Sequence, residues 1–157
     1  MTHTKEELDE ILAFGTSLAR KAGDKIQAAF LQNKNIQTKS CNTDLVTETD
    51  QQVEAMIIQD IKQCYPKHKF IGEESVADGL KCELTDEPTW IVDPVDGTTN
   101  FVHRFPYVAV CLGFCVNKER TLGIVYNAVS GQMYTAIKGH GAFCNGKPLK
   151  VSSETGK

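Results

Sequence analysis

The sequence has no long apolar run, no block of basic residues and no closely paired cysteines. Its longest apolar stretch, residues 107–116, is too short to cross a bilayer as a helix. The net charge of the 157-residue chain is −3, so the basic patch typical of nucleic-acid binding is missing. None of the six cysteines forms a C-x-x-C pair, which disfavours a zinc site. These features argue against membrane-spanning, nucleic-acid-binding and zinc-binding proteins.

Signals for export are also missing. The first ten residues are polar and acidic, unlike a secretory leader, and the sequence has no N-x-S/T glycosylation sequon. Cys111 and Cys115 lie at even spacing in an apolar run, and we expect them to be small core residues on one face of a strand. The sequence therefore predicts a reducing, cytoplasmic setting.

What is present is typical of a globular α+β domain. Thr4 and Glu7 fit a capping box, and the spacing of the apolar residues that follow predicts a helix over 5–31. A second helix is predicted over 47–64, and Pro66 ends it. A short strand is predicted at 70–71, with a further candidate at Ile36. Residues 76–89 are predicted to be a loop.

The rest of the chain is rich in β-forming residues. Apolar runs after residue 106 are separated by turn sequences at 117–120, 130–131 and 145–146. Two helices that lead into an antiparallel meander predict an α+β fold, with all 157 residues in one domain or in part of a larger one.

The stretch WIVDPVDGTTNF, residues 90–101, places two carboxylates beside the core. Residues 90–92 are predicted to be a buried strand that ends at Asp93, and Pro94 then turns the chain at once. Asp93 and Asp96 can converge across that turn, although charged groups beside a core are costly without a compensating cation. Mg²⁺ prefers such oxygen ligands, and the carbonyl of Val95 is a further candidate.

The residues that follow favour an anion. Gly97 allows the backbone to approach a ligand closely, and a helix that begins near Thr98 would offer unpaired N–H groups to a phosphate. A metal ion and a phosphate at one turn are what metal-assisted phosphoester hydrolysis requires.

Other interpretations of these acids remain open. D-P-x-D-G is a favourable turn sequence in its own right. Phosphatases of the haloacid-dehalogenase type use D-x-D-G-T, but here two residues separate the acids. Glu73 in IGEES could stand at a strand end beside Asp93, or it could be a solvated loop acid. Asp50 would lie in the first turns of the second helix, where negative charge is favourable in any protein.

The segments DLVTETD, FIGEES, WIVDPVDGTTNFVHRFP and GAFCNGKPL, in this order, closely resemble the inositol monophosphatase family, particularly its animal-type members. The resemblance implies a layered αβαβα sandwich and usually a homodimer. It also implies lithium-sensitive, Mg²⁺-dependent hydrolysis of phosphomonoesters such as myo-inositol 1-phosphate.

The same resemblance implies the roles of individual residues. Glu73, Asp93 and the Val95 carbonyl would hold one metal ion, and Asp93 and Asp96 would hold a second. The phosphate would be bound by Glu73 and by the residues of the turn, Val95, Asp96, Gly97 and Thr98. The catalytic group would be Asp50, Glu73 and Thr98, of which Thr98 and Asp50 help to activate the attacking water.

The likeness covers one half of the family's length. Family members continue into a second half, whose W-D-x-A-A-G motif completes the second metal site, whereas the only tryptophan here is Trp90. Residues 1–157 therefore correspond to the N-terminal metal- and phosphate-binding part, and we expect them to be nearly inactive alone.

Two alternatives stay open: another phosphatase of the superfamily, such as a bisphosphate nucleotidase, or a non-catalytic chain that binds cations or partner subunits. The NFVHRFP continuation favours the inositol branch.

Overall fold

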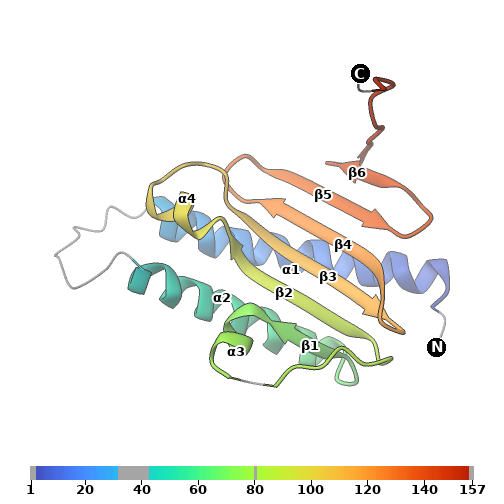
Figure 1. Cartoon of the computed structure of the whole chain (residues 1–157), viewed down its shortest axis with the longest axis horizontal. Helices are drawn as coiled ribbons and strands as arrows, with labels where there is room; N and C mark the ends of the chain where they lie inside the picture. The colour runs from blue at the N-terminus through green and yellow to red at the C-terminus, as the bar shows by residue number, and fades with distance from the viewer. Residues whose placement is uncertain (1–2, 32–42, 80, 156–157) are drawn as a thin grey trace.

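The computed structural model describes residues 3–31, 43–79 and 81–155, with side chains in the second range from residue 48 onward. The helices in these ranges are α1 (Lys5–Leu31), α2 (Thr43–Cys64), α3 (Glu73–Ala77) and α4 (Thr98–Val102). The strands are β1 (Lys69–Gly72), β2 (Thr89–Asp96), β3 (Ala109–Val116), β4 (Glu119–Asn127), β5 (Gln132–Ile137), β6 (Ala142–Cys144) and β7 (Lys147–Pro148) (Figure 1).

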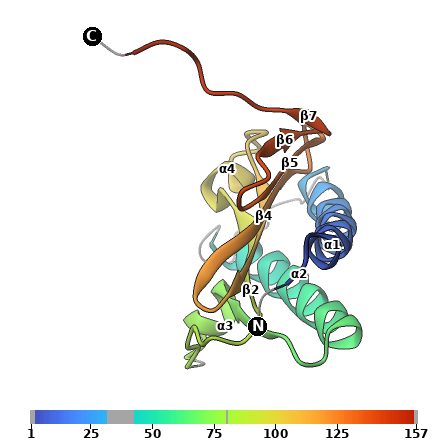
Figure 2. The ribbon, with the colours of Figure 1, turned by 90° about the vertical axis from the view of Figure 1, so that its right-hand side faces the viewer.

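The strands form one sheet in which spatial order follows chain order. β1 pairs with β2 in parallel, and every later neighbour is antiparallel. Figure 2 shows α1 and α2 packed together on one side of this sheet. The predicted α+β class and the antiparallel meander are therefore confirmed.

The first helix follows its sequence signals closely. The amide of Thr4 donates to Glu7 Oε2 at 2.8 Å and the amide of Glu7 donates to Thr4 Oγ1 at 3.2 Å, which completes the predicted capping box. One face of α1 is buried against β3, β4 and β5. Its members recur at helical spacing: Leu8, Ile11, Gly15, Leu18, Ala19, Ala22, Gly23 and Ile26.

The core lies between the two long helices and the sheet. Trp90 and Phe114 are directly opposite each other on β2 and β3, with ring centroids 5.0 Å apart, and both are fully buried. The other face of the sheet is more open, since Ile91, Val125 and Tyr134 are 38%, 39% and 37% exposed. The expectation of a fully buried strand over 90–92 is therefore wrong at Ile91, because the long helices cover only one face.

The bounds of several elements differ from the sequence prediction. The second helix begins at Thr43 rather than at residue 47. A short helix, α3, extends into the predicted loop, and β2 continues through Pro94 to Asp96 instead of ending at Asp93. The candidate strand at Ile36 lies outside the described residues. Within the described ranges, no helix is both long enough and apolar enough to span a membrane.

Candidate metal and phosphate site

A β-bulge brings the two aspartates of β2 to one face of the sheet. Asp93 pairs with Cys111 and Asp96 pairs with Ala109, so Pro94 and Val95 together stand opposite a single residue of β3. Residues three apart on a regular strand point to opposite faces, and the extra residue cancels this alternation. Asp93 and Asp96 therefore converge as expected. A bulge brings them together, because the strand continues through Pro94 and does not turn there as we expected.

Cys111 completes a compact group with these two acids. One carboxylate oxygen from each aspartate and the Cys111 Sγ all lie within 4.8 Å of one another, and the Sγ lies 3.9 Å from Asp96 Oδ2. The expectation that Cys111 belongs to the core is wrong, because Val110 and Leu112 on either side of it point into the core instead. Cys115, which follows a second register shift after Phe114, is buried as expected.

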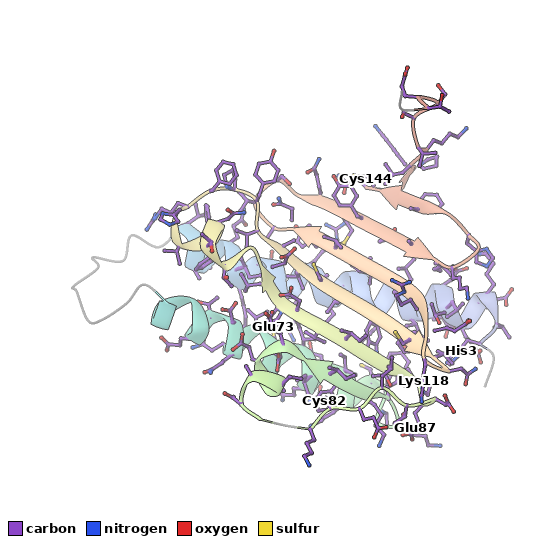
Figure 3. The ribbon with its side chains drawn as sticks, in the orientation of Figure 1. His3, Glu73, Cys82, Glu87, Lys118 and Cys144 are labelled. Atoms are coloured by element: carbon purple, nitrogen blue, oxygen red, sulfur yellow. The ribbon has the colours of Figure 1, made fainter. Side chains whose placement is uncertain are left out.

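Glu73, which directly follows β1, lies next to Asp93. The parallel pairing of β1 with β2 sets Gly72 opposite Val92, so the residues that follow them in the chain, Glu73 and Asp93, lie side by side. Glu73 is close enough to Asp93 to raise the pKa of the Asp93 carboxyl. Figure 3 labels Glu73 where α3 meets β2. The sequence-based expectation that these two acids are neighbours agrees with this geometry.

In this group, Asp93 has a raised pKa and one buried oxygen without a hydrogen-bond partner among the described residues. Burial, the hydrogen bond and charge of Glu73, and the charge of Asp96 raise the pKa of Asp93 to about 7, and a hydrogen bond from the Val95 backbone opposes this rise. Asp93 Oδ1 is buried and has no hydrogen-bond partner among the described residues. Burial, followed by the charges of Asp93 and Asp96, raises the pKa of the Cys111 thiol to about 12.

Asp50 adds a second buried carboxylate near this cluster. It lies on α2, is 3% exposed, and its Oδ1 also lacks a partner within the described part of the chain. Burial and then the charges of Glu74, Glu73 and Asp93 raise its pKa to about 7. A carboxylate in this environment is poised to exchange a proton near neutral pH.

These observations fit a hard divalent cation. The carboxylates of Asp93 and Asp96 converge, Glu73 lies beside Asp93, and one buried oxygen of Asp93 has no partner among the described residues. A cation would supply the missing positive charge, and Mg²⁺ prefers oxygen donors of this kind. The side chain of Val95 points into the core, and its carbonyl remains a predicted ligand.

The turn after β2 has the backbone shape that its glycine suggested. Gly97 has φ 90° and ψ 42°, in the left-handed region, and α4 begins at the next residue, Thr98. A Cβ atom on Gly97 would lie 2.7 Å from the carbonyl oxygen of Tyr107, which accepts a hydrogen bond from Asn100 Nδ2 at 2.9 Å. The turn is thus closed tightly beside Asp96, and phosphate binding there remains a prediction.

The two residues expected to orient water come from neighbouring helices. Asp50 lies on α2 and Thr98 on α4, and these helices contact each other. Thr98 is exposed, and no hydrogen bond joins the two side chains within the described residues. Their shared role stays a prediction.

One buried acid near the site was missed from the sequence. Glu54 is 3% exposed and contacts the first turn of α3. The available signal was its position four residues after Asp50 and three before Ile57, which places it on the face of α2 that packs inward.

The α+β fold and the acidic cluster together define a candidate divalent-cation site beside a tight glycine turn. The chain belongs to the inositol monophosphatase family, whose model matches residues 7–157. It is 58% identical to inositol monophosphatase 1 of Homo sapiens over 145 residues, which are 92% of this chain and 52% of that protein.

Solved structures show the same fold. Inositol monophosphatase-II from Staphylococcus aureus MSSA476 matches with a TM-score of 0.81 and 32% identity, over 93% of this chain and 53% of that one. Inositol monophosphate-bound SaIMPase-II matches with a TM-score of 0.75 and 30% identity, over 93% and 50%. The chain spans about half the length of the curated relatives it matches.

Proposed function

We propose that this chain forms the metal- and phosphate-binding part of a Mg²⁺-dependent phosphatase that converts inositol monophosphates, such as myo-inositol 1-phosphate, to inositol and phosphate. The observation that carries the proposal is the bulge that turns Asp93 and Asp96 to one face, with Glu73 beside them. Similarity to human inositol monophosphatase 1 and to inositol monophosphate-bound SaIMPase-II supports this choice of substrate.

The acids and one carbonyl would hold the cations. Glu73, Asp93 and the carbonyl of Val95 would bind one Mg²⁺, and Asp93 and Asp96 would bind a second. Bound Mg²⁺ supplies positive charge that favours ionisation of water and offsets the charge of the phosphate. Asp93 would contribute to both sets of ligands, so we expect it to be the most sensitive position in the site.

The remaining residues would bind the phosphate and orient the water. The turn from residue 95 to residue 98 would bind the phosphate oxygens through its backbone, and the left-handed conformation of Gly97 would allow the phosphate to approach. Thr98 would hold the attacking water through its hydroxyl, and Oδ1 of Asp50 would accept a proton from it. Glu73 would help to activate this water from the side of α3.

Membership of the family also supports proposals about the whole enzyme. We infer lithium sensitivity, a homodimeric assembly and a cytoplasmic setting for the whole enzyme, and we treat residues 1–157 as the N-terminal part of its catalytic domain. The chain by itself is expected to release little phosphate, because it spans only about half the length of the active relatives' chains.

A chimera tests the proposal directly. This chain would replace the corresponding N-terminal part of human inositol monophosphatase 1, with which it is 58% identical over 145 residues. Phosphate release from myo-inositol 1-phosphate would be measured with and without Mg²⁺ and lithium. We expect Mg²⁺-dependent, lithium-sensitive release that disappears in the Asp93→Asn chimera and persists in a matched Asp24→Asn control, since Asp24 is exposed on α1.

The outcomes separate the alternatives. Faster release from a nucleoside bisphosphate than from inositol 1-phosphate would favour the nucleotidase. A folded chimera that releases no more phosphate than its Asp93→Asn variant would favour a non-catalytic, cation-binding chain and contradict the proposal.

A further inference from the structure

We propose that Glu54 is a positioning residue, whose buried carboxylate holds the first turn of α3 and thereby places Glu73 at the candidate metal site. This inference rests on the proposed function, because it assigns Glu54 a role through a predicted metal ligand. It concerns a residue outside the group of Asp93, Asp96 and Cys111 and the neighbouring Glu73.

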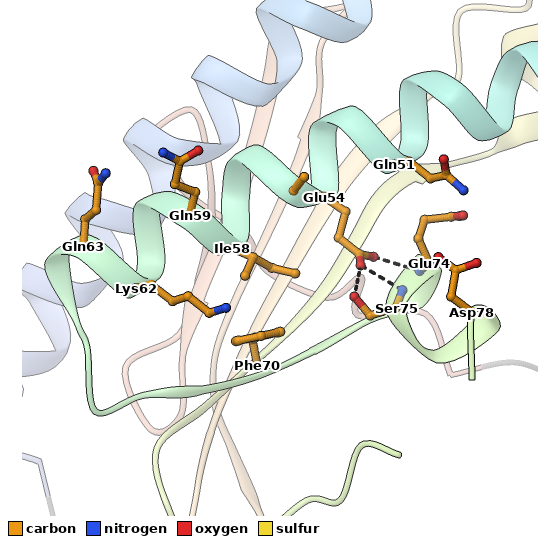
Figure 4. Close-up of a pocket in the computed structure, with 11 residues that line it drawn as sticks. Gln51, Glu54, Ile58, Gln59, Lys62, Gln63, Phe70, Glu74, Ser75 and Asp78 are labelled. Carbon is orange, nitrogen blue, oxygen red and sulfur yellow. Dashed lines mark hydrogen bonds between the residues drawn. The ribbon is translucent and has the colours of Figure 1, made fainter. Parts of the chain in front are cut away.

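The carboxylate of Glu54 takes the place of a helix cap. Glu54 Oε2 accepts the amide of Glu74 at 2.8 Å, and Oε1 accepts the amide of Ser75 at 2.9 Å and the Ser75 hydroxyl at 2.5 Å (Figure 4). The residue before the helix, Gly72, has no side chain with which to cap it. These amides belong to the group that an α-helix leaves unpaired at its start, so a residue 20 positions away satisfies them.

Gly72 provides the space for this contact. A Cβ atom on Gly72 would lie 2.4 Å from both Cδ and Oε1 of Glu54. Its φ of −105° and ψ of 146° are open to any residue, so the requirement for glycine here is one of space and not of conformation. The carboxylate therefore packs directly onto the backbone just before Glu73.

The contacts surround Glu73 without involving its side chain. Glu54 touches Gly72 on one side of Glu73 and binds Glu74 and Ser75 on the other. The Glu73 carboxyl is left to face Asp93, because the pairing of Gly72 with Val92 sets the two following residues side by side. A buried carboxylate that accepts three hydrogen bonds from Glu74 and Ser75 and lies against Gly72 restricts the direction in which Glu73 can point.

The burial of Glu54 requires hydrogen-bond partners. Glutamate is almost never fully buried unless it is paired, and Glu54 is 3% exposed. Burial of a carboxylate is costly unless hydrogen bonds or charges compensate it. Three hydrogen bonds to the start of α3 offset this cost.

Cation affinity of the full chain is the readout, with Mn²⁺ as the probe and isothermal calorimetry as the method. We expect Glu54→Gln and Glu54→Asp each to raise the Mn²⁺ Kd by roughly 10-fold to 100-fold, as is typical for groups that orient a metal ligand. Glu54→Asp keeps the charge but shortens the side chain, so it separates positioning from a simple electrostatic effect. Glu48→Gln, an exposed glutamate of the same helix, is the matched control, with an expected change below about twofold.

A double-mutant cycle with Glu73→Gln provides the decisive comparison. If Glu54 acts through Glu73, then Glu54→Gln changes the Kd by less than about twofold once Glu73 has been replaced. An equal loss of affinity in both backgrounds, or a normal Kd for Glu54→Asp, would overturn the inference. Absence of Mn²⁺ binding by the wild-type chain would instead remove the proposed metal site, and this inference with it.

Ser75→Ala is a second variant that keeps the inference testable if Glu54→Gln does not fold. It removes one hydrogen bond to Glu54 and leaves both backbone bonds in place. We expect a Kd increase of roughly threefold to tenfold with an unchanged circular dichroism spectrum. An unchanged Kd for Ser75→Ala, in a case where Glu54→Gln is unfolded, would count against positioning and favour a purely structural cap.

Discussion

Replacement of Asp50 by asparagine should stabilise the metal-free protein at alkaline pH. The Asp50 carboxyl is 3% exposed, and burial together with the charges of Glu74, Glu73 and Asp93 raises its pKa from 3.8 to about 7. A carboxyl with a raised pKa in the folded state binds its proton more tightly there than in the unfolded chain. Its contribution to stability is therefore complete below pH 4 and is lost as the pH rises through 7.

The size of the effect follows from this shift. At about 1.4 kcal/mol per pKa unit, ionisation of Asp50 in the fold costs at most about 4 kcal/mol at pH 8. The asparagine removes the charge but leaves a buried amide that is incompletely bonded, which costs about 1–3 kcal/mol. The net expectation is a gain of roughly 1–3 kcal/mol at pH 8, or about 2–12 °C in Tm for a chain of this size. At pH 4 the charge no longer contributes, so the gain is replaced by a loss of roughly 1–3 kcal/mol from the buried amide.

Thermal unfolding followed by circular dichroism in EDTA, from pH 4 to pH 8.5, measures this gain. The exposed Asp24→Asn serves as the control and should follow the wild type at every pH. A Tm difference between Asp50→Asn and the wild type that stays constant across this range would refute the reasoning, because it would show that Asp50 does not titrate with a raised pKa.

Three further predictions concern the neighbouring residues. Asp93→Asn should leave the fold intact and stabilise the metal-free form by relieving repulsion between like charges, while abolishing activity of the chimera. Normal turnover of this variant at saturating Mg²⁺ would contradict the assignment of Asp93 as a metal ligand. Thr98→Ala should lower the chimera's kcat by roughly 10²–10⁴-fold and change KM less, whereas a pure KM effect would make Thr98 a phosphate anchor. Gly97→Ala should lower stability by about 1–3 kcal/mol, seen as a lower denaturant midpoint, because of its φ of 90° and the 2.7 Å approach to Tyr107; a midpoint equal to that of the wild type would show that the turn relaxes freely.

The long elements could be predicted because their signals are local. The capping box of Thr4 and Glu7 and the apolar spacing that follows set the bounds of α1 without reference to the sheet. Turn residues such as Asn145 and Gly146, both at positive φ, marked where neighbouring strands reverse. A meander pairs each strand with the next one along the chain, so these turns were enough to give its order.

The missed features all depend on contacts between distant residues. The start of α3 is capped by Glu54 from another helix, so the sequence around Glu73 contains no N-cap signal. The bulge in β2 is defined only by its register with Cys111 and Ala109, so the local motif suggested a turn at Pro94 instead.

The acids of the site were recognised from their residue types, but their geometry was not available from the sequence. Asp93 and Asp96 belong to one motif, whereas Glu73 joins them only through the parallel pairing of β1 with β2. The inward position of Asp50 likewise comes from the packing of α2 against β2 and α3. Tertiary contacts, not the motif, turn four separate acids into one electrostatically coupled group.

Cation binding by the chain itself is the most direct test of the central claim, that Glu73, Asp93 and Asp96 form a divalent-cation site. Isothermal calorimetry at pH 7.5 would compare Mg²⁺ and Mn²⁺ binding by the wild-type chain and by Asp93→Asn. The account predicts saturable binding by the wild type and a Kd at least about 10-fold higher in the variant, because Asp93 is shared by both proposed ions. Equal binding by the two proteins, or no saturable binding by the wild type, would contradict it.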